Sequence, residues 1–523
     1  MLVKVFSAAL SGLRAMPVVV EVNSFASKMP MFTLVGLPDN AVRESTTRVR
    51  SAIANSQFKL PQMSYTVNFA PADVKKEGSG YDLPLAVGLL AAANLVETTR
   101  MEKTLLIGEL GLDGSIRPVR GALPIAVKAR KEGYDNLIVP HDNVREAAVV
   151  NQIKVYGAER LTDVVDFLNG KPSLTQTIVN TRAEFYAAQT DNALDFAEVK
   201  GQENVKRAFE VAAAGGHNII LIGSPGCGKS MMARRLPSIL PGLTLAESLE
   251  TTEIHSVAGK LGSETSLIAQ RPFRSPHHTI SDVALIGGGT NFQPGEISLA
   301  HNGVLFLDEL PEFSRAALET MRQPLEDRQI TISRTKYSTT IPCNFMLVAS
   351  MNPCPCGYHN DPNHHCSCTP GQIQRYMSKI SGPLLDRIDI HCEIQAVPFA
   401  QLSQMQPGEP SSVIRERVIK ARNIQTERFS SLPKQGGLGR VYCNAQMTER
   451  MLHEFAEPDA ASLDMLRMAM ERLKLSARAY SRILKVARTI ADLAGSEKVE
   501  TMHIAEAIGY RNLDRGDWAE RGI

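Results

Sequence analysis

The sequence has few aromatic residues and almost no net charge. Phe, Trp and Tyr together make up 6% of its 523 residues, Trp518 is its single tryptophan, and its formal net charge is +2. A net charge this small excludes a nucleic-acid-binding field that covers the whole molecule. Any contact with DNA or RNA therefore has to come from local basic patches.

Long hydrophobic runs and a secretory leader are also missing. The longest apolar run, LPLAVGLLAAANLV at residues 83–96, contains Pro84 and Asn94 and is shorter than the roughly 20 residues that span a bilayer. The first residues, MLVKVFSAALSGLRAM, are broken by Arg14 and do not have the layout of a signal peptide. We therefore expect a cytoplasmic protein without a membrane partner. In that compartment its eight cysteines are thiols or metal ligands rather than disulfides.

The chain is long enough for several domains. A length of 523 residues predicts roughly two to four of them, and a hydrophobic content of 43% supplies their cores. Residues 1–170 alternate strand-like runs with amphipathic segments, which predicts an α+β unit, and residues 171–197 form a polar linker. Residues 198–397 have the pattern of an α/β core, and residues 398–523 become helical after a linker-like start. The predicted fold class is a multidomain α/β protein.

The most specific motif is a glycine-rich loop between a strand and a helix. Residues 218–222 form an apolar run typical of a buried strand, and the pattern G-x-x-x-x-G-K-S follows it. Backbone N–H groups of such a loop surround phosphate oxygens, and the dipole of the next helix favours the negative charge. Lys229 is expected to reach the β- and γ-phosphates, and Ser230 to ligate Mg²⁺. The predicted nucleotide-binding residues are Gly223, Ser224, Pro225, Gly226, Cys227, Gly228, Lys229 and Ser230.

A second apolar strand ends in two acids. Residues 304–307 are followed by Asp308 and Glu309, at the strand end where α/β sheets place their ligands. Asp308 suits the Mg²⁺ shell, and Glu309 suits a base that orients and polarises the attacking water. Together with the glycine-rich loop, these acids predict a protein that binds and hydrolyses a nucleoside triphosphate.

Four cysteines form two close pairs. Cys354 and Cys356 are followed after nine residues by Cys366 and Cys368. Four thiolates in two pairs are able to close a tetrahedral, structural Zn²⁺ site, although one intervening residue per pair is fewer than the usual two to four. Free cytosolic thiols are the alternative. A histidine between the pairs is able to replace one thiolate as a zinc ligand; the candidates are His359, His364 and His365.

The first 170 residues resemble the Lon-protease-like domain that begins proteins of the ComM/YifB family. Matching KKEGSGYD to the serine loop of Lon puts Gly80 at the nucleophile, with Ser79 one place early, and matching RPVRGALPIAVKAR to the lysine segment puts Pro124 at the lysine. Neither residue performs that chemistry, so we expect no proteolysis. A scaffold, a DNA-facing collar and a mere assembly aid remain open as roles.

The rest of the chain resembles AAA+ modules of the magnesium-chelatase clade. The segment at residues 199–202, VKGQ, is similar to the one that flanks adenine in AAA+ proteins and implies ATP. The glycine-rich stretch at residues 271–303 occupies the place of an insertion in helix 2 that faces the ring pore in this clade. Within it, we interpret His277 and His278 as a hydrogen-bonded structural pair rather than metal ligands.

The resemblance also implies roles for single polar residues. Asn352 matches the sensor-one residue that positions the hydrolytic water. Arg387 matches the arginine that enters the neighbouring active site, which implies an oligomer, most simply a ring of six; a pair with Asp386 or Asp389 is the alternative. Arg478 matches sensor two, with Arg482 as the fallback; pairing with acids on a helix face is the alternative for either. A hairpin at residues 326–350 projects into the pore in this clade, and its predicted DNA contacts are Arg328, Arg334 and Lys336.

Membership of this family implies a function that the residues alone do not give. It is an ATP-driven hexameric DNA helicase or translocase that promotes branch migration of recombination intermediates during natural transformation. Its partners would be single-stranded and branched DNA and recombination proteins. The alternatives are a chelatase-like metal-insertion motor and a regulatory ATPase that remodels a protein partner.

Overall fold

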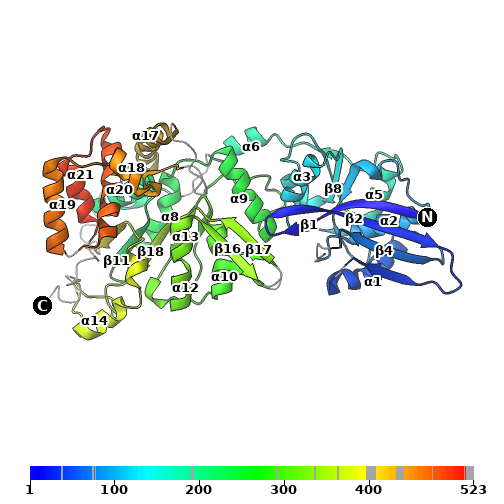
Figure 1. The fold of residues 1–523 in the computed structure, drawn as a ribbon, viewed down its shortest axis with the longest axis horizontal. Coiled ribbons are helices and arrows are strands. Elements are labelled where there is room, and N and C mark those ends of the chain that lie inside the picture. The colour runs from blue at the N-terminus through cyan, green and yellow to red at the C-terminus, as the bar shows by residue number, and fades with distance from the viewer. Residues whose placement is uncertain are drawn as a thin grey trace.

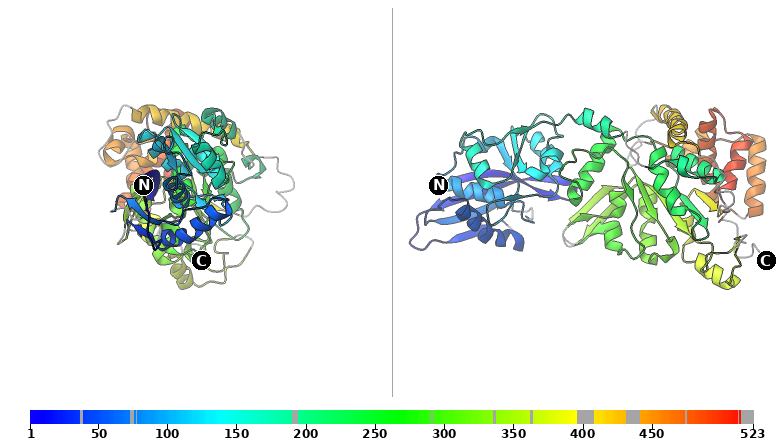
Figure 2. Two further views of the ribbon diagram at one scale, coloured as in Figure 1. Left: turned by 90° about the vertical axis from the view of Figure 1, so that its right-hand side faces the viewer. Right: turned by 180° about the vertical axis from the view of Figure 1, so that it is seen from behind.

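The computed structural model is an elongated chain of three units. It describes residues 1–36, 39–72, 76, 78–189, 194–289, 292–334, 337–361, 364–395, 408–430, 441–473, 475–511 and 513. The N-terminal unit lies at one end, a parallel sheet lies in the middle, and a group of helices lies at the other end (Figures 1 and 2). Among the described residues, no helix is long and apolar enough to cross a membrane.

The N-terminal unit is built on an eight-stranded mixed sheet. Its strand order is β10-β9-β8-β5-β1-β2-β4-β3. The long antiparallel pair β1–β2 lies at its centre, and α2, which is buried along its whole length, contacts both of these strands. The strands are β1 (Leu2–Ser11), β2 (Arg14–Phe25), β3 (Phe32–Val35), β4 (Ser64–Ala70), β5 (Thr104–Leu106), β8 (Asn136–Pro140), β9 (Lys154–Ala158) and β10 (Gln176–Thr177). The helices are α1 (Asn40–Asn55), α2 (Asp82–Ala92), α3 (Ala122–Lys131), α4 (Val144–Ala147) and α5 (Leu161–Leu168), and β6 (Glu109–Leu110) pairs with β7 (Ile116–Arg117).

The segment expected to be a linker carries ordered structure. Strand β10 lies beyond residue 170 and pairs with β9, so the N-terminal sheet continues into this segment. Helix α6 (Thr181–Ala188) follows, with the Asn180 side chain accepting a hydrogen bond from the Ala183 N–H as its N-cap. Neither element was predicted from the sequence, because most of their side chains are exposed and the segment therefore has no clear hydrophobic periodicity.

The central unit is a parallel α/β domain. Its sheet has the order β12-β15-β18-β11-β19, and every neighbouring pair is parallel. The strands are β11 (Ile219–Gly223), β12 (Phe273–Arg274), β15 (Val304–Leu307), β18 (Met346–Met351) and β19 (Ile390–Ile394). Strands β11, β15 and β18 are buried from end to end, as their continuous apolar runs predict. Because they are parallel, their carboxyl ends meet at one edge of the sheet.

Helices and two small hairpins surround this sheet. The helices are α7 (Glu203–Gly215), α8 (Lys229–Ile239), α9 (Leu245–Ala258), α10 (Asp282–Ile286), α11 (Glu296–Leu299), α12 (Arg315–Thr320), α13 (Arg322–Asp327), α14 (Pro370–Met377) and α15 (Gly382–Leu385). The insertion expected at residues 271–303 contains α10, α11 and the short pair β13 (Gly287–Gly288) with β14 (Gln293–Pro294). The hairpin expected at residues 326–350 forms as β16 (Gln329–Arg334) and β17 (Tyr337–Pro342).

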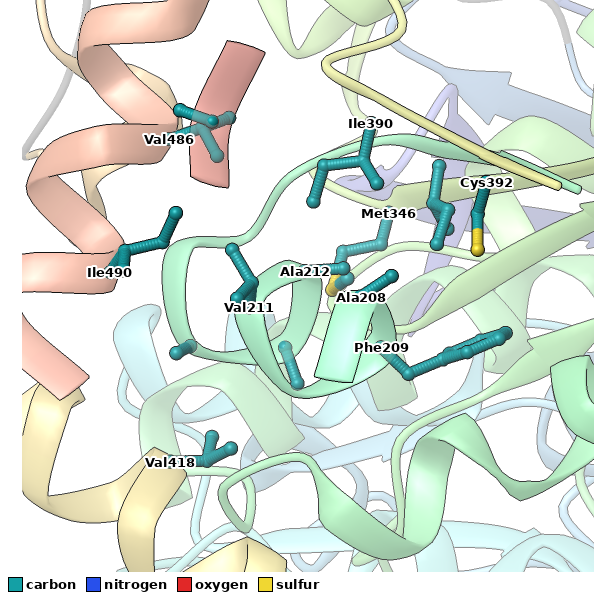
Figure 3. Packing of buried hydrophobic residues seen from close by; sticks show 14 of the residues in the cluster. Ala208, Phe209, Val211, Ala212, Met346, Ile390, Cys392, Val418, Val486 and Ile490 are labelled. Atoms are coloured by element: carbon teal, nitrogen blue, oxygen red, sulfur yellow. The ribbon is translucent and has the colours of Figure 1, made fainter. Parts of the chain in front are cut away.

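The C-terminal unit is helical and shares a core with the sheet. Its helices are α17 (Ser411–Ser430), α18 (Glu449–Phe455), α19 (Ala460–Leu473), α20 (Ala477–Ala494) and α21 (Thr501–Gly509). Helix α7 lies between the two units (Figure 3). Its Ala208, Phe209, Val211 and Ala212 face strand residues Met346, Ile390 and Cys392 on one side and helix residues Val486 and Ile490 on the other. The helical unit and the sheet therefore share one hydrophobic core, with α7 in contact with both.

The N-terminal unit is packed against the central one. Ala8 and Ala15 of the β1–β2 pair belong to the same hydrophobic cluster as Leu243 and Leu267 of the central unit. Gly121 is the N-cap residue of α3, and its N–H donates to the Ser256 carbonyl of α9 at 3.0 Å. The turn of the β1–β2 hairpin lies beside β17 (Figure 1), close enough that a Cβ atom at Gly12 would collide with Thr339.

Candidate functional site

The glycine-rich loop lies at the carboxyl end of the central strand. It leaves β11 at Gly223 and ends where α8 begins at Lys229. Gly226 and Gly228 have φ angles of +79° and +95°, which are conformations that glycine adopts without strain. Both glycines lie directly before the N-terminus of α8, which is where a phosphate-binding loop places its anion.

Lys229 connects the loop to the next strand. Its Nζ donates to the Gly223 carbonyl at 2.6 Å, to the Ser224 carbonyl at 3.0 Å and to Asn352 Oδ1 at 3.2 Å. Burial lowers the pKa of Lys229 from its ordinary value, although the nearby carboxylate of Asp308 opposes this shift. The structure thus brings the predicted phosphate lysine and the predicted sensor-one amide into direct contact.

Asp308 is held by two hydroxyl groups. Ser230 Oγ donates to its Oδ2 at 2.7 Å, and Ser350 Oγ donates to its Oδ1. A hydroxyl and a carboxylate side by side at a P-loop form the oxygen set that Mg²⁺ uses in such sites, so Ser230 and Asp308 fit the predicted metal. Sequence reasoning missed Ser350, because a serine inside an apolar strand gives no signal until its neighbours in the sheet are known.

Glu309 lines an open cavity between the strand end at residue 308, the cysteine loop and α14. Its φ angle is +54°, which is uncommon for a residue with a side chain, and its N–H donates to Asp308 Oδ1 at 3.1 Å. Its carboxylate and Asn352 line a cavity of about 680 Å³, together with Arg375 and Lys379 of the α14 region. A general base needs access to water, and the open cavity gives the Glu309 carboxylate that access.

His278 contacts Glu309. The rings of His277 and His278 lie 4.1 Å apart, and the hydrogen bond of the His277 ring is to the Thr279 hydroxyl at 2.9 Å, not to His278. His278 Nδ1 is also 3.4 Å from Glu309 Oε2, so this histidine faces the predicted base as well as its neighbour. No local pattern connects the two residues, because 31 positions separate them in the chain.

Arg387 lies at the opposite edge of the sheet from the nucleotide loop. The Asn218 side chain, at the amino end of β11, donates to the Arg387 carbonyl at 3.1 Å. The P-loop leaves the carboxyl end of the same strand, so the strand separates Arg387 from the phosphates of its own subunit. The Arg387 guanidinium binds Glu326 Oε2 at 2.5 Å and the Pro383 carbonyl at 2.7 Å. Within its own subunit it is paired, with Glu326 rather than with either predicted aspartate.

The two sensor-two candidates lie beside Arg387. Arg478 Nη1 is 3.5 Å from Asp386 Oδ2, and the Arg478 side chain is 65% exposed. Arg482 Nη1 donates to the buried Asp389 at 3.0 Å, and Asp389 also contacts His217 at 3.1 Å. Arg482 is therefore tied to the core of its own subunit, whereas Arg478 is exposed and loosely held. Neither lies at the carboxyl edge that carries the P-loop of its own subunit.

The four cysteines converge. Their sulfur atoms all lie within 4.8 Å of one another, with Sγ–Sγ distances of 3.7 Å for Cys354–Cys366 and 3.6 Å for Cys356–Cys366. Four thiolates about 2.3 Å from a zinc ion lie about 3.8 Å apart in a tetrahedron, so this set of sulfur ligands fits Zn²⁺. His364 instead contacts Asp361 at 3.2 Å, and among the described residues no histidine belongs to the cluster.

Removing one cysteine of this cluster tests for zinc. We expect about one zinc per chain in the purified protein, and we expect Cys366→Ser to lose the metal and lower the melting temperature, because the loop it closes follows Asn352 directly. Metal analysis with thermal unfolding measures both. Cys443→Ser, a buried cysteine outside the cluster, is the control for metal content. Zinc-free wild-type protein prepared without chelator would exclude the site.

The predicted DNA contacts and the Lon-like positions are only partly described. Arg328 lies at the base of the β16–β17 hairpin and turns to Asn344, not to the tip. The Arg334 side chain and Lys336 are outside the described residues. In the N-terminal unit, Ser79 Oγ donates to Glu109, while Pro124 is buried in α3. Ser79 is therefore paired with a glutamate, and the position matched to the catalytic lysine of Lon is a buried proline.

A parallel sheet with a P-loop and acidic strand end, followed by a helical unit, defines a P-loop ATPase of the AAA+ type. Family models agree with this class: "Magnesium chelatase, subunit ChlI" matches residues 195–402, "Subunit ChlI of Mg-chelatase" matches residues 20–143, and "Magnesium chelatase, subunit ChlI C-terminal" matches residues 408–511.

Full-length relatives narrow the assignment. The chain is 44% identical to Competence protein ComM of Haemophilus influenzae over 98% of its length and 97% of the relative's. It is 43% identical to the uncharacterized protein YifB of Escherichia coli, with the same coverage. A shorter stretch, 27% of the chain, is 29% identical to Lon protease 2 of Bacillus subtilis. The chain therefore belongs to the ComM/YifB family of magnesium-chelatase-like AAA+ ATPases, and this family implies ATP and Mg²⁺ as ligands.

Proposed function

We propose that this chain is an ATP-driven hexameric motor that moves DNA strands and promotes branch migration of recombination intermediates during natural transformation. One observation carries the motor part of the proposal. Arg387 and Arg478 lie together at the edge of the sheet opposite the P-loop of their own subunit. The Arg478 side chain is 65% exposed and faces any neighbouring subunit, whereas the Arg387 side chain is 11% exposed and has to leave Glu326 to reach a neighbour's nucleotide.

Such an arrangement favours a closed ring. An arginine that serves the next subunit makes a head-to-tail contact, and repeated head-to-tail contacts close into a ring when the rotation allows it. The guanidinium of Arg387 would then stabilise charge on the transferred phosphoryl group. In the free subunit its carboxylate partner, Glu326, neutralises it; that hydrogen bond, first among the causes, lowers the pKa of Glu326.

The DNA part of the proposal has two supports. One is the β16–β17 hairpin, whose exposed face carries hydroxyl pairs, Thr331 with Thr340 and Ser333 with Ser338, each 3.0 Å apart. Hydroxyl groups of this kind contact phosphates without reading sequence. The other is the full-length similarity to a protein named for competence. Recombination proteins are the partners that this role requires.

A DNA-dependent ATPase assay tests the proposal. We expect single-stranded DNA to stimulate ATP turnover by the purified protein, and forked or branched substrates to be unwound in an ATP-dependent manner. Lys229→Ala is the control, because it removes the phosphate lysine and with it both activities. If DNA changes neither turnover nor oligomeric state, the result favours an ATPase that remodels a protein partner. A metal-inserting enzyme, which the match to magnesium chelatase suggests, is the other alternative.

A further inference from the structure

A small cavity beneath the sheet is lined by three arginines. It has a volume of about 70 Å³ and lies at the amino ends of β11, β15 and β18, on the opposite side of the sheet from the P-loop. The described residues that line it include Arg271, Arg328 and Arg422, with Glu247 as their single carboxylate. We call this space the arginine cavity. Three guanidinium groups against one carboxylate leave it with an excess of positive charge.

Arg271 and Glu247 are satisfied by their own surroundings. Arg271 donates to the carbonyls of Pro241, Asn302 and Gly242 at 2.7, 2.7 and 3.3 Å, and its Nη2 lies 3.7 Å from Glu247. Glu247 also accepts from the Thr244 N–H at 2.8 Å and from its hydroxyl, which caps α9. This pair therefore has a structural role, and it leaves no carboxylate for the other two arginines.

Arg328 and Arg422 have unused donors. Arg328 Nη1 donates to Asn344 Oδ1 at 2.5 Å, and Arg422 donates from Nε and Nη2 to the Ala213 carbonyl at 3.2 and 2.9 Å. Within the part of the chain that the structure describes, neither makes an ion pair. Each guanidinium has five N–H donors, so both keep donors for a further acceptor. Burial is the largest cause that lowers the pKa of Arg328; Cys443 and Asp389 oppose the shift, and Arg482 and Arg422 add to it.

We propose that the arginine cavity binds a phosphate group. Guanidinium groups match the geometry of phosphate oxygens, and charges this crowded in a region of low dielectric need a counter-anion. The volume has room for several water molecules and hence for a tetrahedral oxyanion, but it is far below the roughly 300–1,000 Å³ of a pocket for a larger ligand. The phosphate would come either from free inorganic phosphate or from a terminal phosphate of a nucleic acid strand.

This site is distinct from the nucleotide site and does not depend on the proposed function. Its lining joins α17 and residues 442–446, at the start of the helical unit, to residues that directly precede β15 and β18. Those strands carry Asp308 and Ser350 near their other ends. A bound anion would thus link the helical unit to the strands of the active site.

Phosphate-dependent thermal stability tests the proposal. The full-length protein is used in a Lys229→Ala background, which weakens phosphate binding at the P-loop, and potassium phosphate is compared with potassium chloride at equal ionic strength. We expect 10 mM phosphate to raise the apparent melting temperature by about 2 °C or more, and Arg328→Gln to abolish this shift. Without phosphate, Arg328→Gln should melt at or above the temperature of its parent, because it removes a crowded charge.

Arg422→Gln and Arg467→Gln serve as second test and control. Arg422→Gln should also lose the shift, whereas Arg467, which is 69% exposed and pairs with Asp464, should be replaceable without effect on it. The proposal fails if phosphate gives no shift, or if the Arg328 and Arg467 variants respond alike. Single-stranded oligonucleotides with and without a 5′-phosphate distinguish the sources. If the melting temperature rises only with the 5′-phosphorylated oligonucleotide, and only when Arg328 is present, the site binds the end of a strand. If the two oligonucleotides have the same effect on the melting temperature, the site binds free phosphate.

Discussion

Replacing Glu309 with glutamine is expected to leave ATP binding intact and to lower hydrolysis by about two to four orders of magnitude. Glutamine preserves the shape of the side chain but accepts no proton from the attacking water. The Mg²⁺ ligands should be undisturbed, because the Ser230 and Ser350 hydroxyls donate to Asp308, and Ser350 contacts Glu309 only through its backbone N–H, which the substitution keeps. Steady-state turnover together with binding of a fluorescent nucleotide measures the two effects separately.

Glu312→Gln is the matched control for this experiment. Glu312 lines the same cavity and is exposed, but its carboxylate pairs with Lys379 at 3.0 Å. We expect this variant to retain turnover within a few-fold of the wild type. If Glu309→Gln hydrolyses ATP at the wild-type rate, Glu309 is not the base, and its partner His278 becomes the group to replace next.

The parts of the site that follow directly in the chain were predictable from the sequence. The P-loop is a contiguous motif that specifies its own turn and the start of the next helix. Asp308 and Glu309 directly follow a short run of apolar residues, which by itself predicts a buried strand. The cysteine pairs were found in the same way, by spacing. In each case the signal is local, so no knowledge of the tertiary fold was needed.

The contacts between distant residues were not predictable. Ser350 reaches Asp308 because β15 and β18 are neighbours in the sheet, and the strand order does not follow the sequence. His278 reaches Glu309 through the folding of an insertion. The DNA contact expected of Arg328 stays a prediction, but its place was not predictable: a left-handed turn at φ +54° ends α13 there and puts it at the hairpin base and not at the tip. Basic character alone does not say which way a side chain faces.

Loss of the Arg387 side chain is expected to reduce hydrolysis by about three to five orders of magnitude while nucleotide binding persists. The reason is its position: the length of β11 separates Arg387 from the P-loop of its own subunit, so under the proposed function it acts on a neighbour's nucleotide. Arg387→Ala and Lys229→Ala should each be inactive alone. When the two proteins are mixed and allowed to exchange subunits, some active sites should combine an intact P-loop from the first with an intact Arg387 from the second.

Recovery of ATPase activity in that mixture is the decisive measurement. A mixture of Lys229→Ala with Glu309→Gln is the matched control, because both changes damage the same subunit's half of the site. Both proteins keep Arg387 but neither has an intact nucleotide half, so no mixed site regains activity. If the Arg387 mixture also stays inactive although subunits exchange, Arg387 does not act across the interface. Its pair with Glu326 would then be its whole role, and the case for a ring built on this arginine would fall with it.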